Sequence, residues 1–133
     1  MIVQKLNPFN IQCDESQLKV SNSEIQLIQH PSCLNIAHLG FSALLLNKIS
    51  ILNFYTQSGR SVSFEYVDKK FRLFPNGARQ YCCEISRWEI EAIDGLIVEC
   101  LLGIHTKRVS IDTELENDYR TVDFSFTVSE YFI

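Results

Sequence analysis

The chain has 133 residues, of which 46% are hydrophobic and 21% are charged, and its net charge is −4. This length is close to the common size of one domain, and the apolar share is too high for an intrinsically disordered chain. We therefore expect a single globular domain over residues 1–133. The N-terminus lacks the basic start and apolar run of a secretory signal, which predicts a cytoplasmic location. The most apolar later stretch, Gly95–Ile104, is too short to span a bilayer, so no membrane association is expected.

The charge is unevenly distributed along the chain. The first 66 residues are neutral as a whole, so the net charge of −4 lies in residues 67–133. Within that half, Val109–Ile133 contains six acids and Arg120 as its only base. A surface of this kind repels phosphates and attracts cations, which argues against nucleic acid there and favours a basic protein partner.

The first half of the chain alternates polar and apolar residues with a period of two, which predicts strands. Two such strands, Leu18–Val20 and Glu24–Gln29, bracket the turn residues Ser21-Asn22-Ser23. Two more, Lys48–Thr56 and Ser61–Val67, flank a four-residue hairpin loop.

The next predicted strand is Lys70–Phe74, joined to its predecessor by a tight turn at Asp68-Lys69. Pro75-Asn76-Gly77 ends this strand, because proline cannot donate to a ladder and Asn-Gly tolerates positive φ.

Two segments match helical spacing. The first runs from Phe41 to Leu52, with Ser42 as a candidate N-cap. The second begins at Ser86, which forms an S-x-x-E capping box with Glu89, and is expected to stop at Gly95.

The last third reads as extended chain. Leu96–His105 is apolar on both faces, as in a central strand, and it is followed by an alternating hairpin whose strands begin near Val109 and Val122. Together, the predicted strands and helices indicate a mainly β fold: an antiparallel curved sheet or small barrel with one or two short helices. An α+β arrangement is the alternative.

An acidic row in this hairpin is the main functional candidate. Asp112, Glu114, Glu116 and Asp118 occupy alternate positions, and Asp123 follows on the return strand. Alternate positions of a strand lie about 6.5–7 Å apart on one face. Four carboxylates there cannot be buried together, since each unpaired charge would cost several kcal/mol. The row is then either a solvated strand face or a docking strip for a cationic protein.

The sequence supports a metal site or a catalytic nucleophile less well than it supports the acidic row. The acidic row lacks the glycine and the twelfth-position glutamate of a calcium loop. His30, Cys33 and His38, with Cys100 and His105, match no common zinc spacing. The odd number of cysteines without a C-x-x-C pair predicts reduced thiols with no catalytic duty. We expect no metal, no cofactor and no catalytic residues.

In charge, size and lack of a catalytic motif, the chain resembles the broad group of bacterial immunity proteins that block toxin nucleases. The resemblance rests on general character over the whole chain. It implies a small inhibitor that binds a basic protein, such as a toxin domain, through Asp112, Glu114, Glu116, Asp118 and Asp123. Two alternatives stay open: a β-barrel that holds a small apolar ligand, and an enzyme built on cysteine and histidine. The sequence does not indicate the oligomeric state.

Overall fold

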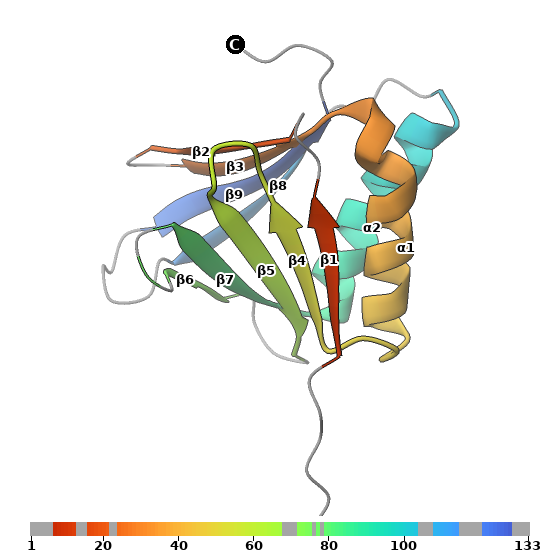
Figure 1. Ribbon diagram of the computed structural model, residues 1–133, viewed down its shortest axis with the longest axis horizontal. Helices are drawn as coiled ribbons and strands as arrows, with labels where there is room; N and C mark the ends of the chain where they lie inside the picture. Colours follow the sequence, from red (N-terminus) through yellow and green to blue (C-terminus); the bar gives the residue numbers. More distant parts are fainter. Residues whose placement is uncertain are drawn as a thin grey trace, which may run out of the picture.

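The computed structural model describes residues 7–12, 16–21, 24–67, 72–75, 77, 79–103, 108–114 and 121–128, and it describes the backbone alone for residues 72, 108–114 and 121–123. Its elements form two mixed sheets beside a pair of helices (Figure 1). In chain order they are β1 (Pro8–Gln12), β2 (Gln17–Val20), β3 (Glu24–Gln29), a 3-10 turn (Pro31–Cys33), α1 (Leu34–Leu45), β4 (Ile51–Tyr55), β5 (Ser61–Tyr66), β6 (Arg72–Pro75), β7 (Gln80–Ile85), α2 (Arg87–Leu101), β8 (Arg108–Glu114) and β9 (Thr121–Val128).

The larger sheet has five strands in the order β1-β4-β5-β7-β6. β4 and β5 form the antiparallel hairpin that the alternation predicts, and the same holds for β2 and β3 in the other sheet. β1 pairs with β4 and β5 with β7, in both cases parallel. The predicted hairpin at Asp68-Lys69 is wrong, because β7 lies between β5 and β6 and β6 pairs with β7 instead. The prediction that β6 ends at Pro75 is confirmed.

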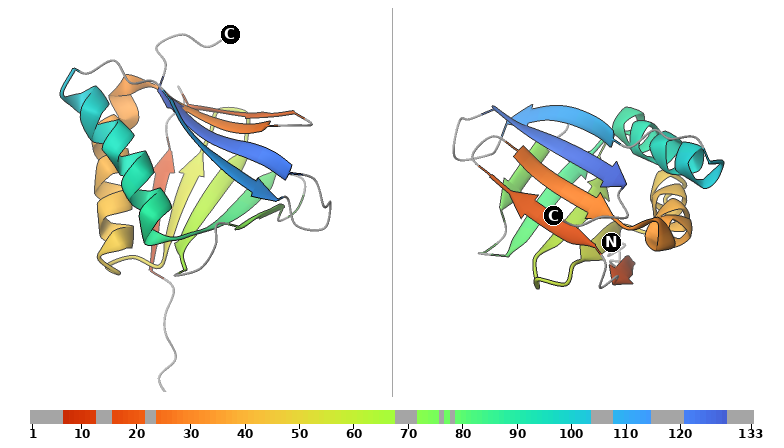
Figure 2. Two further views of the ribbon diagram at one scale, coloured as in Figure 1. Left: turned by 180° about the vertical axis from the view of Figure 1, so that it is seen from behind. Right: turned by 90° about the horizontal axis from the view of Figure 1, so that it is seen from above.

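The smaller sheet has four strands in the order β2-β3-β9-β8. β8 and β9 form the predicted antiparallel hairpin, whereas β3 pairs with β9 in parallel. Three parallel pairs and two separate open sheets contradict the predicted mainly β fold of one antiparallel curved sheet or small barrel. The fold is α+β, because two long helices fill one side of the space between the sheets (Figure 2).

Both helices differ from their predicted bounds. α1 spans 12 residues and ends at Leu45, so the predicted start at Ser42 is wrong and residues from Ile51 onward form β4. α2 spans 15 residues and continues past Gly95 to Leu101, where a central strand was expected. Ile90, Ile93 and Ile97 are spaced three and four residues apart on its buried face, which is the helical signature.

The start of α2 agrees with the sequence only in part. Ser86 is the N-cap residue, as predicted, but its side chain makes no capping hydrogen bond. Glu89 is only 9% exposed, and its Oε2 has no hydrogen-bond partner among the residues that the structure describes. Its position in the first helical turn places the carboxylate at the positive end of the helix dipole, which compensates part of the cost of burying it.

The core lies where the inner faces of both sheets meet the two helices. Phe41 of α1 contacts rings from both sheets, with centroid distances of 5.3 Å to Phe64 and 6.0 Å to Phe126. Phe64 also lies edge-on to Phe124 at 5.7 Å. These rings are fully buried and pack on one another. These aromatic side chains are therefore core-packing residues.

Candidate functional site

The predicted acidic row lies on a strand at the margin of the smaller sheet. β8 contains Asp112 and Glu114 at alternate positions, and it occupies the edge of the sheet next to β9. The backbone register places Asp112 directly opposite Asp123 of β9. Glu116 and Asp118 lie outside the described residues. The structure thus brings three of the five predicted residues onto two neighbouring strands.

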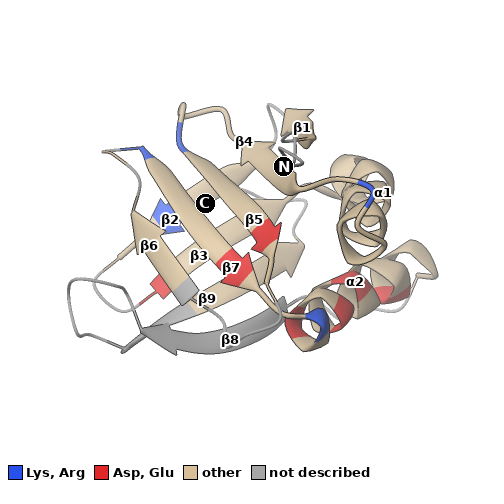
Figure 3. Ribbon diagram, turned by 90° about the horizontal axis from the view of Figure 1, so that it is seen from below, with Lys and Arg blue, Asp and Glu red and all other residues tan. Residues whose placement is uncertain are grey.

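Further acids gather on the helix that packs beside β8. Glu91, Asp94 and Glu99 lie on the exposed or half-exposed side of α2, and α2 contacts β8. Figure 3 shows these acids along α2, together with acids at the carboxyl ends of β5 and β7. The latter are Glu65 and Glu84, which the parallel register places side by side. The sequence did not connect them with the acidic row, because their neighbourhood depends on strand order.

Some of these carboxylates already have partners within the molecule. Arg87 donates to Glu91 over 3.1 Å, and His38 Nδ1 lies 2.7 Å from Asp94 Oδ1. In the register, Arg72 stands opposite Glu84. By contrast, neither Glu65 nor Glu99 has a hydrogen-bond or ion-pair partner within the described part of the chain, and both are exposed. We define the acidic face as Glu65, Glu84, Glu91, Asp94, Glu99, Asp112, Glu114 and Asp123. Among its described side chains, Glu65 and Glu99 carry negative charge that no described cation compensates.

The cysteine and histidine candidates do not assemble into a site in the described residues. No group of three or more metal-ligating side chains occurs there, and His105 is outside them. His30 accepts a hydrogen bond from the Ser32 N–H at 3.1 Å and so caps the 3-10 turn. Cys33 is disulfide-bonded, so the expectation that every cysteine is reduced is wrong. Burial, with a contribution from Glu99, raises the pKa of Cys100 and disfavours its nucleophilic thiolate.

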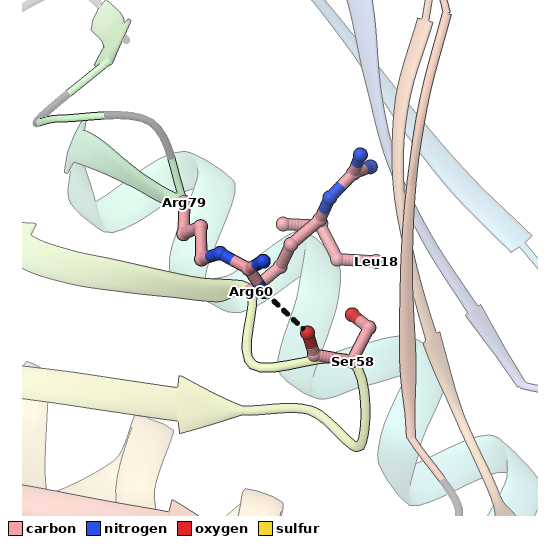
Figure 4. Close-up of a pocket in the computed structure, with 4 residues that line it drawn as sticks. All are labelled: Leu18, Ser58, Arg60 and Arg79. Atoms are coloured by element: carbon pink, nitrogen blue, oxygen red, sulfur yellow. Dashed lines mark hydrogen bonds between the residues drawn. The ribbon is translucent and has the colours of Figure 1, made fainter.

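A second charged region, which the sequence did not predict, lies at the other end of β5 and β7. The side chains of Leu18, Ser58, Arg60 and Arg79 line an open pocket of about 480 Å³ between the β4–β5 turn and β2 (Figure 4). Lys19 lines the adjoining hollow on the β2 side. We call these five residues the arginine groove. The only sequence signal was that Arg60 and Arg79 each stand immediately before a strand.

No protein-family model matches the chain, and no curated protein resembles it closely enough to count as a relative. In the described residues, neither helix combines the length and apolarity needed to cross a membrane.

Proposed function

We propose that this protein binds and neutralises a basic protein partner through its acidic face. The observation that carries the proposal is the gathering of acids on α2 and at the carboxyl ends of β5 and β7 (Figure 3), beside the β8–β9 hairpin, whose backbone register sets Asp112 opposite Asp123. Such a field accelerates encounter with a cationic surface and disfavours partners of like charge.

The position of β8 supports protein recognition over simple solubility. An edge strand has no strand neighbour on its outer side, so a protein partner can approach β8 without displacing another strand. The register also sets Asp112 against Asp123, an arrangement that is unfavourable unless a cation lies nearby. A basic partner would supply that cation and remove the repulsion.

The partner class that fits best is a toxin nuclease. A nuclease surface is cationic because it must bind phosphates, so an acidic protein can occupy its substrate cleft. This choice agrees with the resemblance to bacterial immunity proteins in charge, size and absence of a catalytic motif. Asp112, Glu114 and Asp123, with Glu116 and Asp118 on the connecting segment, would contact the cleft, and Glu65 and Glu99 would extend the contact.

The test measures association with a panel of purified cationic nuclease toxin domains, together with inhibition of their cleavage of nucleic acid. Glu65→Gln and Glu99→Gln each remove one uncompensated charge, and we expect each to slow association about three- to tenfold at low salt. In 0.5 M salt the difference should largely disappear, because the Debye length falls to about 4 Å.

The matched control is Gln57→Lys, which changes the net charge by the same amount on an exposed turn at the other end of the molecule. It should bind and inhibit as the unchanged protein does. Equal loss in the control and in the two glutamate variants would show that only overall charge matters. Absence of saturable binding to any domain of the panel at low salt would contradict the proposal.

A further inference from the structure

The arginine groove owes its charge to the strand arrangement. β5 and β7 run parallel with Ser61 opposite Gln80, and the Ser61 N–H donates to the Arg79 carbonyl over 2.8 Å. Arg60 and Arg79, which immediately precede these two positions, therefore emerge side by side. Two neighbouring guanidinium groups repel each other unless an anion lies between or above them.

One of the two arginines is held in place. Arg79 Nη1 donates to the Ser58 carbonyl over 2.9 Å, and its side chain lies across the β4–β5 turn (Figure 4). Gly59, at φ +81°, leaves room for the Arg79 side chain to lie there, since a Cβ at residue 59 would lie 3.2 Å from Arg79 Nη1. The turn is braced further, because Thr56 Oγ1 donates to the Arg60 carbonyl over 2.7 Å. The hydrogen bond to Ser58 thus fixes the position of the Arg79 guanidinium, and its remaining N–H groups are held in place with it.

Arg60, the other arginine, does not brace the turn through its side chain. Within the described residues, the Arg60 guanidinium has no hydrogen-bond or ion-pair partner, and it projects over Leu18 towards β2. Lys19 lies on the β2 side. Two hollows adjoin the groove there, and Glu24 is the one acid among the described residues that line them. Among the described residues around the groove, positive charge therefore exceeds negative charge.

We infer that the arginine groove binds a small organic phosphate monoester. The Arg60 guanidinium and the remaining N–H groups of Arg79 offer paired cationic donors, and a phosphate monoester presents three oxygens and close to two negative charges to them, whereas a carboxylate presents two oxygens and one charge. The pocket of about 480 Å³ is within the usual range for small-molecule sites and is far larger than inorganic phosphate. The organic part of the ligand lies over Leu18.

The test is an amide-resolved NMR titration of the full chain at low ionic strength with AMP, inorganic phosphate and adenosine as probes. AMP should shift the amides of Ser58, Gly59 and Arg60 saturably, inorganic phosphate should do so more weakly, and adenosine should leave them unchanged. Arg60→Gln should weaken AMP binding about tenfold or more without loss of folding, because the Arg60 guanidinium has no hydrogen-bond or ion-pair partner among the described residues.

Two further variants complete the design. Arg79→Gln should also weaken AMP binding, and its thermal midpoint reports separately on the lost contact with Ser58. Arg87→Gln removes an arginine from α2, away from the groove, and should bind AMP normally. The inference is overturned if adenosine binds as well as AMP, if the shifts do not localise to the groove, or if Arg60→Gln and Arg87→Gln bind AMP alike. Nuclease inhibition by Arg60→Gln should be unchanged, so each proposal can fail without the other.

Discussion

Two helical glycines provide a matched test of how tightly α1 is seated on the larger sheet. Gly40 is buried in α1, where an added Cβ would lie 2.5 Å from Leu52 Cδ1 and 3.4 Å from Ile11 Cδ1. Gly95 is exposed in α2, and an added Cβ there would meet nothing within 4 Å. Alanine should therefore act on the two helices in opposite directions.

The magnitudes follow from helix propensity and packing. Gly95→Ala should raise the free energy of unfolding by about 0.5–1 kcal/mol, because alanine loses less backbone entropy in a helix. Gly40→Ala gains the same amount but forces Leu52 out of a fully buried position, and overpacking of this kind costs about 1–3 kcal/mol. The net effect at Gly40 should lie between about zero and a loss of 2.5 kcal/mol.

Urea denaturation followed by circular dichroism at 222 nm measures both variants. With a slope near 2 kcal/mol per molar urea, the two midpoints should differ by roughly 0.5–1.5 M. Leu52→Val shortens the side chain that the new methyl group meets, so in the Gly40→Ala background it should cost less than it does alone, with a coupling of about 1 kcal/mol. If Gly40→Ala stabilises the protein as much as Gly95→Ala does, the close seating of α1 on β4 is refuted.

Two further predictions concern ionisable groups. Burial, and then the neighbouring Cys82, raise the pKa of Cys83, so the folded protein keeps this proton at a pH where the unfolded chain loses it. Stability from this group is complete below the unfolded pKa and falls as pH rises above about 8.5, with a slope of up to about 1.4 kcal/mol per pH unit. The free energy of unfolding should thus drop less in Cys83→Ala than in the unchanged protein between pH 8.5 and 10, and parallel pH profiles would contradict the assignment. The half-buried pair of His38 and Asp94 should show a coupling of about 0.5–1 kcal/mol in an alanine double-mutant cycle, against about 0.3–0.5 kcal/mol for the exposed helical pair of Arg87 and Glu91. Equal couplings would show that the half-burial of the first pair has no energetic effect.

Alternation in the sequence predicted where strands lie but not which strands are neighbours. The hairpins β2–β3, β4–β5 and β8–β9 were predictable because a short turn leaves the chain no other partner. The parallel pairs were not, since a period of two encodes which face is buried and carries no information about a partner distant in sequence. The insertion of β7 between β5 and β6 is the clearest case.

The continuation of α2 past Gly95, where the sequence predicts a strand, has a separate physical cause. Leu96 and Ile97 are adjacent and both buried, and a strand buried on both faces has the same short apolar run as a buried helix. Gly95 predicts a helix end, although a solvent-exposed glycine inside a helix costs only about 1 kcal/mol and is tolerated when the flanking turns pack well. The spacing of Ile90, Ile93 and Ile97 is the sequence signal that favours a helix over a strand here.

The same strand order explains why the candidate site was only half predictable. The acidic row is local in sequence, so its strand and its edge hairpin could be predicted from alternation alone. The arginine groove depends on β5 and β7 being parallel neighbours, which places residues 60 and 79 together only after folding. No local pattern records that juxtaposition.

The parallel pair of β5 and β7 also separates the two charged regions. Each strand has an arginine immediately before its first residue, and its carboxyl-terminal half carries a glutamate, Glu65 or Glu84. Glu65 lies five positions after Arg60, about 16 Å along the strand at 3.3 Å per residue. This separation exceeds the Debye length of about 8 Å at physiological salt, so an anion in the groove should leave the acidic face almost unaffected.

At 10 mM salt, where the Debye length is about 30 Å, a doubly charged ligand should measurably strengthen attraction of a cationic partner to the acidic face. Salt therefore distinguishes two independent sites from one continuous surface: AMP should alter nuclease association only at low ionic strength, and an effect that persists at 0.15 M would require a structural link between the two ends.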